Sequence, residues 1–86
     1  MNTPDNTNPI GTTAADRDIA DRILNAMIVK QVTQRTLSEE TGISYPTLRR
    51  SLKGNRSFTF REFYRIAAVL TLKPSVLLPA DLADAA

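Results

Sequence analysis

Three basic residues lie within one short helical segment near the middle of the chain and could bind a negatively charged ligand. Arg49, Arg50 and Lys53 alternate there with Leu48 and Leu52, which are four positions apart and share one face of a helix. The leucines are expected to face a core, which leaves the cations outside. Arginine can donate two hydrogen bonds to a guanine edge, and both arginine and lysine bind phosphates. The spacing therefore predicts a helix offered to a DNA groove.

A second short helix precedes this one, and the signals between the two predict a tight corner. Thr33 is placed to cap a helix over residues 34–41, because its hydroxyl can accept a hydrogen bond from a free amide of the first turn. Gly42 follows, and a glycine there can adopt the positive φ with which many helices end. Ser44 can cap the next helix in the same way, over residues 45–53. We therefore expect two helices joined by a turn, with the basic helix second.

Three further helical segments are expected around this pair. The first begins at residue 13 or 14, and its apolar stripe consists of Ile19, Ile23, Leu24, Met27 and Ile28. Another, over residues 60–70, follows a capping box formed by Thr59 and Glu62. Its buried side and the staple at its start are expected to hold Phe58, Phe60, Phe63, Ile66, Ala67 and Leu70. With a short helix over residues 74–78, the sequence predicts an all-α fold, a compact four- to five-helix bundle.

The chain is long enough for one domain, and its ends differ in composition from its middle. It has 86 residues, which suits a single core. Residues 1–12 are rich in Asn, Thr and Pro, so we expect a flexible N-terminal arm. Residues 13–78 form the expected helix-turn-helix DNA-binding domain, and residues 79–86 form a C-terminal tail.

Composition and charge narrow the class of protein. Cysteine and histidine are absent, which excludes the common zinc sites and thiol or imidazole catalysis. No glycine-rich phosphate loop or paired carboxylates are visible, so we expect no enzyme, metal, cofactor or small-molecule substrate. No segment is apolar for long enough to form a membrane helix, which predicts a soluble cytoplasmic protein. Residues 31–73 hold eight basic and three acidic residues, a net charge of +5 in a chain whose total is +2.

The two-helix segment resembles the helix-turn-helix domains of the lambda repressor and Cro type, often called the XRE family. The family pattern places a glutamine, a small residue, a glycine, a serine and an aliphatic residue at set spacings. The matching residues here are Gln34, Ser38, Gly42, Ser44 and Leu48. Gly54 and the segment IAAVL at residues 66–70 also match, so the resemblance covers roughly residues 17–78.

The sequence departs from the family pattern in three ways. Ser38 stands where alanine is usual, and Thr71 stands where glycine is frequent. Ser51 and Leu52 shift the common apolar position by one residue, which would rotate the basic helix slightly and change the set of side chains that faces the bases.

The resemblance implies a role for each candidate site residue. The helix over residues 45–53 would lie in the major groove, while the start of the preceding helix and the loop that follows would hold phosphates. The expected base-contacting residues are Tyr45, Pro46, Thr47 and Arg50. The expected phosphate-contacting residues are Gln34, Ser44, Arg49, Lys53, Asn55 and Arg56.

The resemblance also implies a function: a sequence-specific transcriptional regulator, a phage or prophage repressor or a Cro-like protein. Its partner would be double-stranded operator DNA, bound as a homodimer at the nucleoid of a bacterial or phage-infected host. An antitoxin or an excision-type DNA-binding factor would share the same pattern. A third alternative is a helical module that binds another protein or a second copy through Val76, Leu77, Leu78 and Leu82.

Several of these residues also have a purely structural interpretation. Tyr45 could merely cover the turn, and Gln34 could only cap its helix. Arg49 and Lys53 could pair with Glu39 or Glu40 on the surface, where such pairs contribute about 0–1 kcal/mol. The phenylalanines at residues 58, 60 and 63 are assigned to the core rather than to a base-stacking platform, because they fall at helical spacing.

Overall fold

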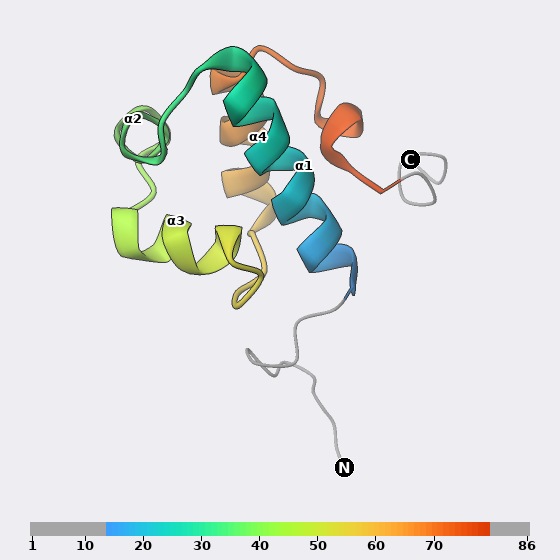
Figure 1. Cartoon of the computed structure of the whole chain (residues 1–86). Coiled ribbons are helices and arrows are strands. Elements are labelled where there is room, and N and C mark those ends of the chain that lie inside the picture. Colours follow the sequence, from blue (N-terminus) through green and yellow to red (C-terminus); the bar gives the residue numbers. More distant parts are fainter. Residues whose placement is uncertain (1–13, 80–86) are drawn as a thin grey trace.

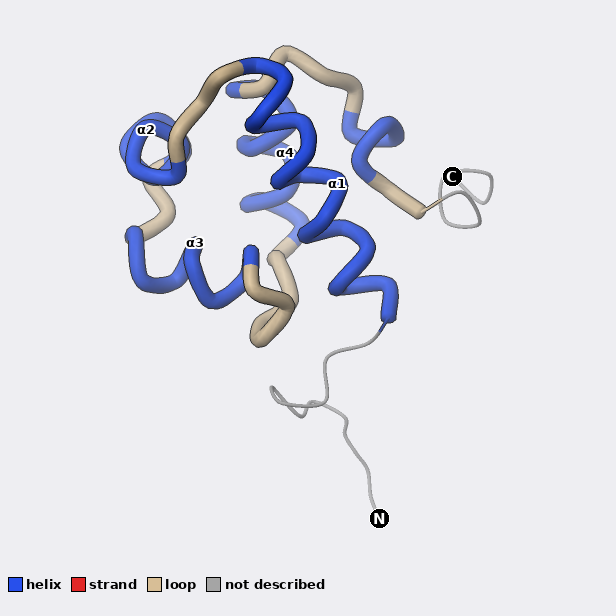
Figure 2. Tube along the Cα trace, viewed as in Figure 1, coloured by secondary structure: helices blue, strands red, loops and turns tan. Residues whose placement is uncertain are grey.

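A computed structural model describes residues 14–79, and these residues form helices and loops without a strand (Figures 1 and 2). The elements in chain order are α1 (Ala14–Lys30), α2 (Gln34–Thr41), α3 (Tyr45–Leu52), α4 (Phe60–Val69) and the short 3-10 helix η2 (Pro74–Leu77). The all-α bundle is thus confirmed. The expected N-terminal arm and residues 80–86 of the expected tail lie outside the described residues.

The corner between α2 and α3 is built from the local signals of the sequence. The Thr33 hydroxyl accepts a hydrogen bond from the Thr36 amide, which caps α2. Gly42 ends the helix in the left-handed conformation at φ 80°, and its amide donates to the Ser38 carbonyl over 3.0 Å. The Ser44 hydroxyl then caps α3 by accepting from the Thr47 amide.

The basic helix ends one residue earlier than expected, because Lys53 is its C-cap rather than its last helical residue. Gly54 follows at φ 79°, a left-handed conformation that glycine adopts without strain. An added Cβ at Gly54 would come within 3.1 Å of the Arg17 Cγ, so the loop after α3 also passes close to α1. Helix α4 opens on the expected capping box, with hydrogen bonds in both directions between Thr59 and Glu62.

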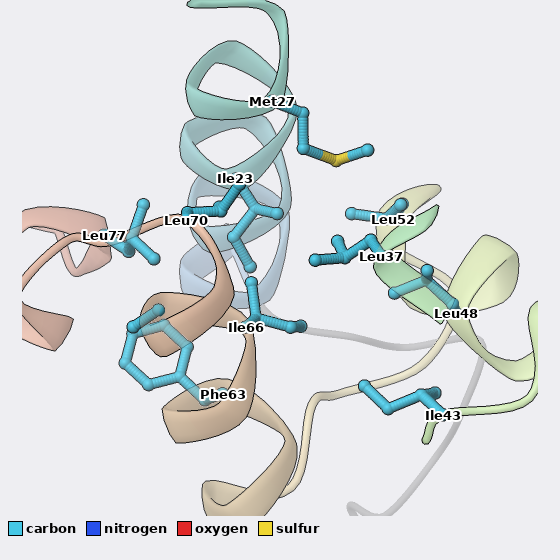
Figure 3. Close-up of a cluster of buried hydrophobic side chains, with 11 residues drawn as sticks. Ile23, Met27, Leu37, Ile43, Leu48, Leu52, Phe63, Ile66, Leu70 and Leu77 are labelled. Carbon is cyan, nitrogen blue, oxygen red and sulfur yellow. The ribbon is translucent and has the colours of Figure 1, made fainter. Parts of the chain in front are cut away.

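The core is shared by all four helices and η2 (Figure 3). Ile23, Leu37, Leu48 and Ile66 are fully buried within it, one from each α-helix in turn. Helix α2 packs against α3 and α4, while α1 packs against α3 and η2. Leu77 of η2 is 1% exposed, so the last turn of the described chain closes the core.

Two apolar residues that were expected in the core lie at the surface instead. Ile28 is 75% exposed because α1 presents Ile23 and Met27 to the core, and the next position along the helix is rotated away from them. Phe60 is 79% exposed because it is the first residue of α4 and extends beyond the edge of the core. Its ring packs on Tyr64, with centroids 5.2 Å apart.

Two helices end in residues with positive φ that are not glycine. Gln31 after α1 has φ 59°, and Thr71 after α4 has φ 57°. The Lys30 ammonium donates a hydrogen bond to the Thr71 hydroxyl over 3.1 Å, which joins the two helix ends. Thr71 stands where the family pattern often has glycine, and its backbone keeps the conformation that glycine favours.

Candidate nucleic-acid interface

The outer side of α3 carries the cations and is open to solvent. Arg49, Arg50 and Lys53 are all exposed, while Leu48 and Leu52 on the inner side are 0% and 4% exposed. Both leucines therefore reach the core in spite of the shifted apolar position. Ser51 is also buried, and its hydroxyl accepts a hydrogen bond from the Arg56 guanidinium, which satisfies a polar group in the core.

Arg50 is exposed and its side chain makes no hydrogen bond or ion pair with any residue from 14 to 79. Its backbone carbonyl accepts a hydrogen bond from the Asn55 amide, which fixes the loop after α3. The guanidinium takes no part in that hydrogen bond. Within the same residues, neither Arg49 nor Lys53 pairs with a carboxylate. The interpretation in which these two cations are neutralised by Glu39 or Glu40 thus has no support in the structure.

An open groove of about 610 Å³ lies beside this surface, between the start of α2 and the length of α3. Its lining residues are Leu24, Thr33, Gln34, Arg35, Tyr45, Arg49, Leu52 and Lys53. Three of them are cations. The start of α2 also borders the groove, and its first turn has no acidic residue and lies at the positive end of the helix dipole. The groove is therefore suited to a polyanion and offers it no negatively charged side chain.

Tyr45 has its ring against two guanidinium groups. The Cζ of Arg35 lies 5.3 Å from the ring centroid, and the Cζ of Arg49 lies 5.8 Å from it. Both distances are within the range of a cation–π attraction. Tyr45 is 36% exposed, so part of it is open to solvent beside the groove.

Arg35 was not among the residues expected at the site, although one sequence signal pointed to it. It is a cation in the first turn of α2, a helix that has no acidic residue there and carries Glu39 and Glu40 towards its other end. This order opposes the helix dipole, which favours acids at the start and bases at the end. A cation placed against local helix preference is a candidate functional residue.

Arg56 has a structural partner of its own. Its guanidinium donates to both carboxylate oxygens of Glu62, over 2.9 and 3.1 Å, as well as to the Ser51 hydroxyl. Burial raises the pKa of the Glu62 carboxyl, but the hydrogen bonds from Arg56 and the Thr59 amide, with the charge of Arg56, outweigh it and hold that pKa below its ordinary value. The expected phosphate contact of Arg56 stays a prediction, and its guanidinium already joins the loop to α3 and α4.

The remaining candidates lie at the ends of the two helices. Gln34 is the first residue of α2 and is half-buried, whereas Pro46 is exposed in the first turn of α3. The Ser44 hydroxyl donates to the Thr47 hydroxyl over 2.8 Å, and the Thr47 hydroxyl keeps its own proton for a further hydrogen bond. Asn55 is exposed in the loop that follows α3. The structure thus brings Gln34 together with Arg49 and Lys53 in one groove and places Asn55 beyond the end of α3.

A comparison with known protein families finds a match that spans most of the described residues. Residues 22–81 match the Cro/C1-type HTH DNA-binding domain. The chain belongs to this family. The match includes α2, α3 and α4, and DNA is therefore the partner of this Cro/C1-type domain. No curated protein and no solved structure matches the chain.

Two further findings concern the described residues. No helix among residues 14–79 combines the length and the apolar character that crossing a membrane requires. The same residues contain no group of three or more acidic, histidine or cysteine side chains that could hold a metal ion. Domains of the Cro/C1 type typically have no enzymatic activity.

Proposed function

We propose that this Cro/C1-type domain is a sequence-specific transcriptional regulator, a phage or prophage repressor or a Cro-like protein. It reads operator DNA by laying α3 in the major groove. The observation that carries the proposal is Arg50, exposed on the outer side of α3 and free of any side-chain partner among residues 14–79. A guanidinium in that state has all of its donors available for a guanine edge.

Seven other expected contacts, all except Tyr45 and Arg56, keep their roles within this proposal. Pro46 and Thr47 lie at the start of α3, the end that approaches base edges in this docking geometry. Gln34, Arg49 and Lys53 line the groove beside it and hold the DNA backbone, which sets register and affinity without reading sequence. Ser44 and Asn55 stand at the two ends of α3, where backbone contacts from a loop are accessible.

We propose that the operator is bound by a homodimer, because two-fold symmetric DNA sites mirror two-fold symmetric proteins. Such a dimer places two copies of α3 in successive major grooves, about 34 Å apart along one face of the duplex.

Selection of bound duplexes from a random DNA pool tests the function directly. We expect enrichment of one motif that contains a guanine in each half and repeats as an inverted pair. Sedimentation of the selected duplex with the full chain should then show two protein chains per duplex. Retention of every sequence alike would overturn sequence-specific regulation, and a single asymmetric half-site bound by one chain would overturn the dimer.

One of the four residues proposed for a helical module that binds another protein is buried in the core. Leu77 is 1% exposed and belongs to the core, so it is not available to a partner, whereas Leu78 is half-buried against the core. Val76 is 53% exposed, and Leu82 lies outside the described residues. An antitoxin or excision-type factor would use the same DNA-binding surface, and a co-encoded partner protein would distinguish these from a repressor.

A further inference from the structure

The contact between Tyr45 and two arginines points to a device that holds the DNA backbone. We propose that Tyr45 positions Arg35 and Arg49 as a clamp on adjacent phosphates of one DNA strand. The clamp rests on the proposed function, and it assigns Tyr45 to positioning rather than to contacting a base.

The clamp joins two helices that meet at the groove. Arg35 belongs to the first turn of α2, while Tyr45 opens α3 and Arg49 follows one turn later. The Cζ atoms lie 5.3 Å and 5.8 Å from the ring centroid, within the roughly 6 Å over which a ring face attracts a cation. Because long arginine side chains lose rotamer freedom on binding, a ring that holds them in the free protein reduces the cost of binding DNA.

Charge favours an anion between these side chains. Arg35 and Arg49 form no ion pair with a carboxylate within residues 14–79. Two like charges beside one ring repel each other, and a phosphate near both relieves that repulsion. Arginine also suits this ligand because its planar fork can donate two parallel hydrogen bonds to phosphate oxygens.

The shape of the site favours a strand over a small anion. The two arginines lie in an open groove of about 610 Å³ that continues to Lys53 at the end of α3. The first-turn amides of α2 add partial positive charge at its other end. A row of cations along an open groove matches the regular spacing of phosphates on a DNA backbone.

Removing the ring while keeping both charges tests the clamp. The full chain is titrated against its selected duplex and against a shuffled duplex of equal length, at several salt concentrations. We expect Tyr45→Leu to weaken binding to both duplexes in the same proportion, by about three- to tenfold. Tyr45→Phe keeps the ring and should bind both duplexes within about twofold of the parent. Tyr64→Leu is the matched control, since Tyr64 is 57% exposed and packs on Phe60 instead of on a cation.

Three results would overturn the clamp while leaving the proposed function intact. The first is parent-like binding by Tyr45→Leu. The second is a loss confined to the selected duplex, which would make Tyr45 a base contact. The third is an equal loss in Tyr45→Phe, which would transfer the role to the hydroxyl. If the parent protein itself bound no duplex, the proposed function would fail, and the clamp with it.

A second set of variants separates positioning from folding. Arg35→Ala should weaken binding to both duplexes and lower the slope of log affinity against log salt by about one. In a chain that carries Arg35→Ala and Arg49→Ala, adding Tyr45→Leu should change affinity by no more than about twofold. Thermal melting of each variant confirms that it is folded at the titration temperature. A full additional loss on the double-variant background would show that Tyr45 does not act through the arginines.

Discussion

Two arginines six residues apart have opposite surroundings, and the difference decides what each can do. Arg50 is exposed and its side chain has no polar partner within residues 14–79. Arg56 is 25% exposed and donates to Glu62 and Ser51. A guanidinium that is already paired must break those hydrogen bonds before it can bind a phosphate. The free one binds without that cost, so sequence discrimination is expected from Arg50 and stabilisation of the fold from Arg56.

Substitution of Arg50 should change base preference as well as affinity. We expect Arg50→Ala to cost about 1–3 kcal/mol of binding free energy at the selected operator and to relax preference at one base pair of each half-site. Arg50→Lys keeps the charge but not the fork, so it should retain affinity for shuffled DNA and still lose that preference. Competition binding against single-base operator variants measures both effects. Unchanged base preference in both variants would refute the assignment.

The ion pair between Arg56 and Glu62 should make the fold sensitive to acid. Because the pKa of Glu62 is lower in the folded protein than the ordinary value of 4.5, the unfolded chain takes up this proton first as the pH falls. The stabilisation is therefore complete above about pH 4.5 and is lost as the pH falls through the folded value.

Urea denaturation at a series of pH values from neutral to acid checks this prediction. Glu62→Gln should be less stable than the parent at neutral pH and should lose less of its free energy of unfolding on acidification. The matched variant is Glu39→Gln, an exposed side chain without an ion pair among the described residues, and it should follow the parent. An acid response in Glu62→Gln as steep as that of the parent would contradict the assignment.

At the scale of the elements, the corner between α2 and α3 sets the direction in which the basic helix projects. Gly42 is left-handed at φ 80°, and the Ser44 cap follows two residues later. Ser38 donates to the Ile43 carbonyl, and Thr41 accepts from the Ile43 amide, so the turn is held by side chains of α2. Ser38, which replaces the usual small apolar residue, thus adds a hydrogen bond that alanine could not supply.

Substitution of Gly42 should reveal the strain of this turn. An added Cβ would lie 3.8 Å from the Arg65 Nη1, an ordinary contact, so the cost arises from the backbone conformation and not from a clash. We expect Gly42→Ala to lower the free energy of unfolding by about 1–2 kcal/mol. Gly42→Asn should lower it by less, because asparagine tolerates this conformation. Chemical denaturation measures both, and equal losses would show that the left-handed backbone is not the cause.

The success of sequence analysis at this scale depends on how local each signal is. The caps at Thr33, Ser44 and Thr59 and the glycine at residue 42 act within four residues of themselves, so their patterns predicted the helix starts and ends. The stacking of Arg35 on Tyr45 joins residues ten positions apart through the angle between two helices. No periodicity encodes that angle, which is why the clamp could not be predicted.

Burial errors have the same origin. Ile28 and Phe60 fit the apolar stripes of their helices, yet α1 presents Ile23 and Met27 to the core, and Phe60 extends beyond the edge of the core. The part of a stripe that becomes buried depends on how the helices pack against one another, which the pattern of a single helix does not show. The ion pair of Arg56 with Glu62 was missed because Arg56 lies in a loop, and no regular structure predicted where its side chain would lie.

At the scale of the whole molecule, the basic surface and the closing segment lie on different sides. Helices α2 and α3 lie on one side of α1, and η2 lies on the other (Figure 1). Helix η2 packs on α1 and α4 and contributes Leu77 to the core. The segment after α4 therefore stabilises the bundle from the side of α1 that faces away from α2 and α3.

Truncation of Leu77 should destabilise the fold without changing sequence preference. We expect Leu77→Ala to lower the free energy of unfolding by about 2–5 kcal/mol, because it removes a buried side chain. Val76→Ala, at the exposed neighbouring position, should stay within about 0.5 kcal/mol of the parent. Urea denaturation gives both values, and operator selection at low temperature should return the parent motif for each variant. Equal effects on stability would contradict the packing of η2.

The left-handed Thr71 has a consequence for how this protein can change. A β-branched residue at φ 57° stores backbone strain, so replacement by glycine there would relieve it. The replacement would also remove the two hydrogen bonds of the Thr71 hydroxyl, with the Lys30 ammonium and the Leu70 carbonyl. That junction lies between α4 and η2, outside the groove and outside α3. Heat tolerance can consequently be adjusted by mutation at this junction without altering any side chain of the groove or of α3.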